Sequence, residues 1–310
     1  MNQSDVIAGF MPATESPSLA HWQTTGKWFN YDGHAVFSQM GGEGEAVLLL
    51  HGFPTSSWDW HRIWPFIAPH YRVFALDMMG FGFSDKPLEY PYSISDQADL
   101  HQGWIEQMGL GRVHILAHDY GCSVAQELLA RSQEDALDFS IASVCFLNGA
   151  VFPEVFKPLF IQKVLAGPLG ALASRVLSRR VFDYNMSRIF GPETQPGHEE
   201  LSDFWQLLLY NNGRGVIHKL MGYLDERRCH RHRWVGSLLR ARQPIRLIAG
   251  TADPVSGRGV IERFRELAPS PDIVAMPGVG HYPHFERPGM VWHHYRDFLK
   301  DTRSPQTSGG

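Results

Sequence analysis

The sequence is poor in cysteine. It has three cysteines in 310 residues, Cys122, Cys145 and Cys229. An odd number at wide spacing does not suit a disulfide framework and favours reduced thiols. We therefore expect a protein of a reducing compartment.

Long apolar runs and an excess of one charge are also missing. No run approaches the ~20 apolar residues that cross a bilayer, and the first 25 residues, with Asp5 and Glu15, lack the pattern of a secretory signal. The 28 basic and 32 acidic residues leave a net charge of -4, which does not attract nucleic acid. We interpret the one short basic cluster as a solvated segment, made of Arg227, Arg228, Arg231 and Arg233. These absences predict a soluble, cytoplasmic protein with no nucleic-acid partner and no membrane span.

An ordinary globular composition is present, with 44% apolar and 19% charged residues. Asp32-Gly33 predicts a hairpin between strands 27–31 and 34–39, and so an antiparallel edge. Six short apolar runs without a polar face read as strands buried on both sides: 46–50, 72–76, 113–117, 142–147, 245–249 and 272–276. Helical patterns fall at 95–108, 122–131, 259–267 and 289–299. This alternation predicts an α/β fold with a mostly parallel sheet.

One interval breaks the alternation. Residues 152–235 keep a helical periodicity with no strand among them, which predicts an inserted helical lid. The expected core is therefore split into 1–151 and 236–303, followed by a loose tail at 304–310. Because open α/β sheets bind ligands at the carboxyl ends of their strands, we expect the lid to cover that edge.

The sharpest motif follows the strand 113–117. His118-Asp119-Tyr120-Gly121 leads directly into a helix, as in the nucleophile elbow G-x-S-x-G, with Ala117 in place of the first Gly and Asp119 in place of Ser. An aspartate, with an unperturbed pKa of ~3.9, is ionised at neutral pH and can displace a leaving group from saturated carbon without a base. The alternative is that Asp119 only caps the following helix.

A base and its orienting acid follow in the order that the elbow motif requires. Asp253 lies just beyond the strand 245–249, and His281 comes after the strand 272–276. We expect Asp253 to orient the His281 ring, which activates water, and Asp119 to join them in one hydrogen-bonded cluster. Asn148, at the end of the strand 142–147, occupies another place for such an acid but has no charge. Asn148→Ala is therefore expected to retain much of the activity that Asp253→Ala loses.

The run His51-Gly52-Phe53-Pro54 supplies the expected oxyanion hole. It follows the strand 46–50, where the second donor of the hole belongs, so we assign the hole to the backbone N–H groups of Phe53 and Tyr120. His51 and His118 are expected to be buried structural residues rather than bases.

Five segments give the chain a family resemblance: 51–60, 80–87, 118–121, 148–154 and 233–236. They resemble the α/β hydrolases of the epoxide hydrolase and haloalkane dehalogenase branch, and most of all the mesoderm-specific transcript protein subgroup. The similarity extends over nearly the whole chain. It implies a hydrolase with an Asp nucleophile, an ester enzyme intermediate and a His-activated water.

The resemblance also implies how the leaving group is stabilised. Epoxide hydrolases usually use two lid tyrosines as acids, and Tyr223 resembles one of them, with Tyr184 as its best partner and Tyr210 as a further lid tyrosine. Haloalkane dehalogenases commonly hold the halide with Trp and Asn, where this chain has Tyr120 and Phe53. Haloacetate dehalogenases have arginines beyond the nucleophile, and none is present here. An epoxide hydrolase is the leading hypothesis, and a haloalkane dehalogenase or a non-catalytic binding protein remains the alternative.

No cofactor or metal is required by this chemistry. The glycines of 77–87 lack a dinucleotide fingerprint, and Cys229, His230 and His232 lack a fourth zinc ligand. Lid aromatics suggest an apolar pocket for a small apolar or amphipathic substrate: Phe156, Phe160, Phe182, Phe190, Phe204 and Trp205. The sequence leaves the oligomeric state open.

Overall fold

The computed structural model describes residues 17–302. The expected tail at 304–310 and the first 16 residues lie outside the described part. Within residues 17–302, no helix has the length and apolar character needed to cross a membrane.

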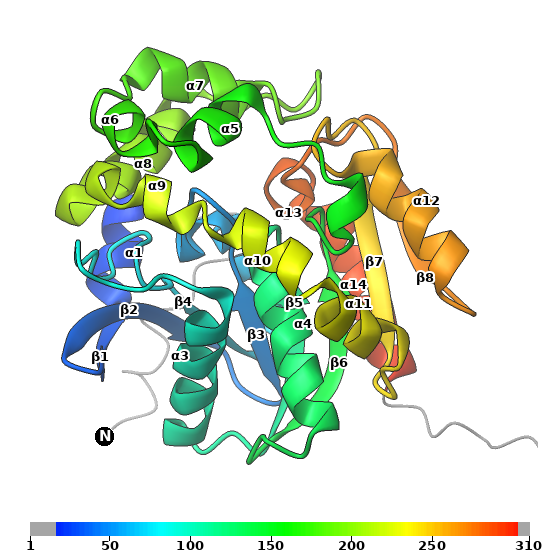
Figure 1. Ribbon diagram of the computed structural model, residues 1–310. Coiled ribbons are helices and arrows are strands. Elements are labelled where there is room, and N and C mark those ends of the chain that lie inside the picture. The colour runs from blue at the N-terminus through cyan, green and yellow to red at the C-terminus, as the bar shows by residue number, and fades with distance from the viewer. Residues whose placement is uncertain (1–16, 303–310) are drawn as a thin grey trace, which may run out of the picture.

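An eight-stranded sheet forms the centre of the molecule (Figure 1), with the order β1-β2-β4-β3-β5-β6-β7-β8. The strands are β1 (Lys27–Tyr31), β2 (His34–Gly41), β3 (Ala46–Leu50), β4 (Arg72–Leu76), β5 (Arg112–Ala117), β6 (Ser140–Phe146), β7 (Ile245–Gly250) and β8 (Asp272–Met276). β1 pairs antiparallel with β2, and β2 pairs antiparallel with β4, whereas the remaining pairs are parallel. The predicted fold class and the antiparallel edge are therefore confirmed.

Burial on both faces explains the uniform apolar strands. Along β3, Leu48 and Leu50 pack into one hydrophobic cluster, while Val47 and Leu49 pack into a second cluster on the opposite face. Because successive side chains of a strand point to opposite faces, such a strand has no polar side. The hairpin before it turns at Asp32 and Gly33, which both have positive φ angles, of 48° and 84°.

Helices cover both faces of the sheet (Figure 1). On one face the larger cluster includes residues of α3 (Ile94–Gln107), α4 (Tyr120–Gln133), α11 (Arg231–Leu239) and α12 (Gly257–Leu267). On the other face the second cluster includes residues of α2 (Trp64–Ile67) and α14 (Pro288–Asp301). The remaining short elements outside the insertion are α1 (Leu19–Thr25), η2 (Ser57–Trp60) and α13 (Pro283–Glu286).

The segment between β6 and β7 is helical, and Figure 1 shows its first helices as a layer above the sheet. It begins with η3 (Pro153–Val155). We call the next helices, with the 3-10 turn among them, the cap helices: α5 (Phe160–Ala166), α6 (Gly170–Arg175), α7 (Arg179–Ser187), α8 (His198–Leu209), η4 (Tyr210–Gly215), α9 (Ile217–Leu220) and α10 (Tyr223–Cys229).

The expected end of the insertion at Val235 falls inside α11. This helix packs against α4 of the core. Trp234 donates a hydrogen bond from Nε1 to Glu127, and the Ser237 hydroxyl donates to the backbone carbonyl of Gln126. α11 therefore contacts the core from its first turn. The sequence pattern did not separate α10 from α11 because both are helical.

Candidate active site

Asp119 lies at a sharp turn between β5 and α4. Its backbone adopts φ 42° and ψ -103°, a strained conformation for a residue with a side chain. Two glycines make room for this turn: a Cβ on Gly121 would lie 2.3 Å from the Leu50 carbonyl oxygen, and one on Gly149 would lie 2.8 Å from Asp119 Cα. The Asp119 side chain makes no capping hydrogen bond to α4. The alternative interpretation as a helix cap therefore does not account for this residue.

The three side chains expected to cluster come together from three strand ends. His281 donates from Nδ1 to Asp253 Oδ2 over 2.8 Å, and its Nε2 lies 4.0 Å from Asp119 Oδ1. All three residues are buried. Asp253 also accepts hydrogen bonds from the backbone N–H groups of Val255, Ser256 and Gly257 and from the Ser256 hydroxyl. Asp253 thus fixes the His281 ring, whereas Nε2 lies beyond hydrogen-bond distance of Asp119, so the expected cluster is hydrogen-bonded on its Asp253 side alone among the three side chains.

The charges of this cluster stabilise one another. Burial alone would lower the pKa of His281, but the charge and hydrogen bond of Asp253, together with the charge of Asp119, raise it to about 9. Burial would likewise raise the pKa of Asp253, but the charge of His281 and the hydrogen bonds from His281, Ser256 and Val255 lower it below its usual range. An imidazolium held between two carboxylates is therefore the favoured resting form.

We expect this cation to make stability depend on pH. Because the folded-state pKa of His281 is about 9, above its unfolded value of 6.5, its contribution is complete below pH 6.5 and is lost as the pH rises through 9. The contribution is at most about 3 kcal/mol. Urea unfolding of wild type and His281→Gln between pH 6 and 10 measures it as the difference in unfolding free energy. A difference that stays constant over that range would contradict the assignment.

The loop after β3 supplies a donor to the nucleophile. The Phe53 N–H donates to Asp119 Oδ2 over 3.1 Å. Tyr120 is the first residue of α4, where a backbone N–H has no partner within the helix. Both groups expected to form the oxyanion hole are thus placed next to Asp119, and Oδ1 is left facing His281.

His51 and His118 lie under the turn as structural residues. His51 accepts from the Met78 N–H at Nε2 and donates from Nδ1 to the Gly52 carbonyl, and burial lowers its pKa to about 3. His118 donates from Nε2 to the His281 carbonyl over 2.8 Å, and burial lowers its pKa to about 3 as well. The hydrogen-bonded nitrogens of both rings thus support the fold, and His118 Nδ1 is buried without a hydrogen-bond partner among residues 17–302.

Asn148 has a role that the sequence did not reveal. Its side-chain amide donates to Asp253 Oδ2 over 2.8 Å and to the Gly250 carbonyl over 3.0 Å, while its oxygen accepts from the Gly250 N–H over 2.7 Å. Asn148 adds no charge, in agreement with the sequence analysis, but it holds the acid loop against β6. Its loss should therefore cost more activity than the sequence alone led us to expect.

The structure brings one of the two expected tyrosines to the site. Tyr223 is fully buried, its ring lies beside Phe53 and Tyr120, and its hydroxyl accepts from Gln162 Nε2 over 3.3 Å. Tyr184 is 62% exposed on α7 and is not brought there. The third lid tyrosine, Tyr210, packs against Phe83, outside the site. The sequence could not separate these residues, since all three lie in helical segments of similar pattern.

Arg227 contradicts the interpretation of its cluster as solvated. Its side chain is 2% exposed. Nη2 donates to the Asp119 carbonyl over 2.8 Å and lies 3.6 Å from Asp119 Oδ1, and Nε donates to the Ser123 hydroxyl. Only Arg228 of the cluster is largely exposed, while Arg231 and Arg233 form ion pairs with glutamates. The available signal was spacing, because Arg227 lies one helical turn after Tyr223.

The comparisons with known proteins identify the family of the chain. Residues 45–288, most of the chain, match the model of the alpha/beta hydrolase fold family. The chain belongs to the α/β hydrolase family. This hydrolase is 39% identical over 300 residues to the mesoderm-specific transcript protein of Mus musculus, covering 93% of this chain and 90% of the relative.

Solved structures of α/β hydrolases share the fold. The haloalkane dehalogenase DatA from Agrobacterium tumefaciens has a TM-score of 0.74 at 19% identity and is covered over 96% of its chain and 89% of this one. The epoxide hydrolase CorEH has a TM-score of 0.73 at 18% identity, covering 99% of its chain and 89% of this one. At such identities the likeness supports the fold and leaves the substrate of this hydrolase open.

A small apolar cavity adjoins Asp119. It has a volume of about 60 Å³, with Asp119 and His281 in its lining. Its other walls come mainly from apolar side chains of the cap helices and nearby loops, among them Leu159, Leu165, Leu177, Phe182 and Ile217. Of the aromatic residues expected around a pocket, Phe182 is in this lining. Since typical ligand pockets measure roughly 300–1,000 Å³, a substrate of ordinary size requires the cap side chains to move.

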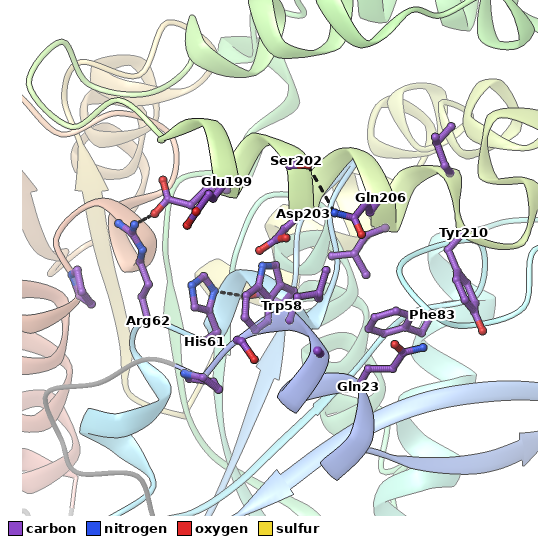
Figure 2. A pocket seen from close by; sticks show the side chains of 18 of the residues that line it. Gln23, Trp58, His61, Arg62, Phe83, Glu199, Ser202, Asp203, Gln206 and Tyr210 are labelled. Atoms are coloured by element: carbon purple, nitrogen blue, oxygen red, sulfur yellow. Dashed lines mark hydrogen bonds and ion pairs between the residues drawn. The ribbon is translucent and has the colours of Figure 1, made fainter.

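A larger cavity of about 1300 Å³ lies elsewhere, lined by parts of α1, η2 and α8 (Figure 2). Trp58, His61 and Arg62 form one side of it, and Glu199 and Asp203 another. No member of the Asp119, Asp253 and His281 cluster lines it. Its size therefore does not make it the site of chemistry.

One group of side chains among residues 17–302 has the donor atoms for a metal ion. Asp59, His118 and His284 have ligand atoms within 4.8 Å of one another. Burial raises the pKa of Asp59 well above its usual value, lowers that of His118 to about 3 and lowers that of His284 as well. The neutral imidazoles are the form that binds a metal ion, whereas the protonated carboxyl group favoured for Asp59 is not.

Proposed function

We propose that this α/β hydrolase hydrolyses an epoxide through an ester formed on Asp119. One observation carries the proposal: a buried carboxylate stands at the elbow beside the cavity, with Oδ2 bound to the Phe53 N–H and Oδ1 near His281 and Arg227. A carboxylate held in this way is suited to attack saturated carbon. Attack on an ester or amide would instead form an anhydride, which is no more stable than the substrate.

The first step opens the epoxide. Asp119 Oδ1 forms a bond to one ring carbon while the bond between that carbon and the ring oxygen breaks, and the electron pair remains on the oxygen. Tyr223 donates its phenolic proton to this oxygen, so that a hydroxyl forms. The contacts of Tyr223 support this role: its ring packs against Phe53 and Tyr120, and its hydroxyl accepts from Gln162, which lines the cavity. The absence of Trp and Asn at positions 120 and 53 makes a halide a less suitable leaving group.

The second step hydrolyses the ester. After the ester has formed, the His281 imidazolium gives its Nε2 proton to solvent. The neutral Nε2 then takes a proton from water, whose oxygen attacks Asp119 Cγ, and the negative charge on Oδ2 is stabilised by the N–H groups of Phe53 and Tyr120. The bond between Cγ and Oδ1 then breaks, and Oδ1 leaves with the product and takes the proton from His281. The second proton of water, left on the new Asp119 carboxyl group, returns to Tyr223. An epoxide and water thus give a diol.

The surroundings support a small apolar or amphipathic substrate in a site closed by a cap. The cavity walls are mostly apolar, and the cap helices supply half of the lining residues. We place this cap at α5–α10, between two parts of one catalytic core. The three free thiols, two of them buried, support a reducing location such as the cytoplasm.

Removing the phenolic proton of Tyr223 tests the type of leaving group. Tyr223→Phe is expected to lower diol formation from styrene-type and aliphatic epoxides by about 10²–10⁴-fold, because the alkoxide then leaves without its acid. Release of bromide or iodide from haloalkanes needs no proton and should fall much less. Diol and halide are measured separately, and Tyr184→Phe, at an exposed tyrosine, is the matched control. Halide release without diol formation in wild type would favour a haloalkane dehalogenase, and turnover of neither would favour a binding protein.

A further inference from the structure

Arg227 is a buried cation that the reaction scheme above leaves without a role. Its guanidinium group lies between two aromatic rings, with Cζ 4.4 Å from the centre of Tyr223 and 5.4 Å from that of Phe156. Burial of a charge costs several kcal/mol unless it is well paired. The groups that pair with the buried Arg227 therefore indicate its role.

These contacts converge on the nucleophile. Among residues 17–302, Asp119 is the one carboxylate within ion-pair distance of Arg227, with 3.6 Å from Nη2 to Oδ1. The same nitrogen donates to the Asp119 carbonyl, while Nη1 has no hydrogen-bond partner in the described part of the chain. The cation thus lies beside Oδ1 and retains an unused donor. Oδ2, in contrast, is bound by the Phe53 N–H.

The position beside Oδ1 is important because this atom has two functions in the proposed reaction. It is the nucleophile in the first step, and in the second step it leaves Cγ with the product. We propose that Arg227 is a further catalytic residue, which stabilises the negative charge that develops on Oδ1 as the ester is hydrolysed. This inference rests on the function proposed for Asp119. Under it, a residue of the cap helix α10 acts in ester hydrolysis and not in ester formation.

The charge balance predicts which step depends on Arg227. Ester formation removes the charge of Asp119 and leaves the guanidinium group beside a neutral ester in a site shielded from water. When water has attacked Cγ and the bond between Cγ and Oδ1 breaks, the electron pair of that bond moves onto Oδ1, before His281 returns the proton. The cation is therefore better paired in this transition state than in the ester, which is the condition for catalysis.

The first step has the opposite requirement. There Oδ1 begins as a carboxylate oxygen already paired with Arg227, and its charge decreases as the bond to carbon forms. A cation beside it stabilises the reactant more than the transition state. Removal of the cation should therefore not slow ester formation. A residue that only fastened α10 to the elbow would have no reason to separate the two steps.

Rapid-quench kinetics of Arg227→Met and Arg227→Lys test the inference, with an epoxide that wild type turns over. Intact mass and peptide mass give the rates at which the ester forms on Asp119 and disappears. Decay is followed only in molecules that have reacted, so a poorly folded fraction lowers the burst amplitude without changing the decay rate. Arg228→Met is the matched control, since the Arg228 side chain is 68% exposed and pairs with Asp225.

For Arg227→Met we expect ester formation within about threefold of wild type and ester decay slower by about 10²-fold, the usual effect of one lost donor to a developing anion. Arg227→Lys, which keeps a charge but not the planar fork, should lose about tenfold in decay. Arg228→Met should leave both steps unchanged. The ester should therefore accumulate in the two Arg227 variants alone.

Three results would overturn the inference. The first is ester decay at the wild-type rate in Arg227→Met, and the second is an equal loss of rate in ester formation and ester decay in that variant. The third is an Arg227→Lys variant that folds and has a normal rate of ester decay, while Arg227→Met gives no burst. Failure of the proposed function is distinguishable from these results. In that case no substrate would give an ester on Asp119 even in His281→Gln, whatever residue stands at position 227.

Discussion

Replacing His281 with glutamine is expected to produce an enzyme that reacts once and then stops. Ester formation needs only the carboxylate of Asp119 and an acid for the leaving oxygen, whereas ester hydrolysis needs a base to deprotonate water. In His281→Gln the decay of the ester should slow by about 10³-fold or more. One equivalent of epoxide per active site should be consumed in a burst, and the opened epoxide should remain bound to the enzyme as the ester.

The adduct of this variant can be located directly. Intact mass should increase by the mass of the substrate, and peptide mass should place the addition on Asp119. Asp119→Ala is the matched control, because it removes the nucleophile and should give neither burst nor adduct. A His281 variant that shows neither burst nor adduct would mean that His281 activates water for direct attack and that Asp119 is no nucleophile.

Isotope labelling gives an independent result for wild type. In a single turnover in heavy-oxygen water, the label should enter the carboxyl group of Asp119, because the product leaves with the original Oδ1. Label that appears at once in the diol would contradict the ester mechanism. This measurement requires no variant and so does not depend on whether the His281 variant keeps its structure.

The resting charge of the site explains how His281 becomes available as a base. Its pKa of about 9 depends on Asp253 and, to a smaller extent, on Asp119. Ester formation abolishes the charge of Asp119, and this part of the upward shift in the pKa disappears with it. The imidazolium then loses its proton more easily, at the stage where a neutral ring is needed. The rate of ester decay should accordingly rise with pH until His281 is neutral.

The fold could be predicted from the sequence because its signals are local. The central strands are buried on both faces, so their apolar runs coincide closely with the observed elements, for instance at β3, Ala46–Leu50, and β4, Arg72–Leu76. The order of Asp119, Asp253 and His281 after three such strands predicts that they lie at one edge of the sheet, since the carboxyl ends of parallel strands meet there. Gly121 indicated a tight turn at Asp119, and in the structure a Cβ at this position would collide with the Leu50 carbonyl oxygen.

The features that escaped prediction depend on tertiary contacts. Arg227 belongs to a run of arginines that looks solvated, and only the packing of α10 over the elbow separates it from the exposed Arg228. Tyr184 and Tyr223 both lie in helical lid segments, yet Tyr184 is exposed and Tyr223 is buried against Phe53 and Tyr120. The sequence showed that Asn148 has no charge, but it could not reveal the hydrogen bonds of this side chain, because their partners follow about 100 residues later in the chain.

Replacing Asp253 with asparagine is expected to lower ester decay by about 10⁴-fold, even though the side chain keeps its shape. The carboxylate accepts the Nδ1 proton of His281 and so leaves Nε2 free to take a proton from water. An amide at position 253 can donate to Nδ1 instead, which places the proton on Nε2 and abolishes the base. Ester formation should persist in Asp253→Asn, so the same adduct on Asp119 should accumulate.

Asn148 provides the comparison that identifies the acid. Asn148→Ala removes one hydrogen bond to Asp253 and two to Gly250 but no charge, so we expect a loss of about tenfold, the equivalent of one hydrogen bond. His281 Nδ1 and Asn148 Nδ2 both lie 2.8 Å from Asp253 Oδ2, so a carboxylate at position 148 would be close to the histidine. The double variant Asn148→Asp/Asp253→Asn should then have an ester decay rate about tenfold higher than that of Asp253→Asn alone. The single variant Asn148→Asp should lose activity, because its two adjacent carboxylates repel each other. Ester decay rates of the four variants decide the matter, and equal losses in Asn148→Ala and Asp253→Asn would mean that Asp253 is not the orienting acid.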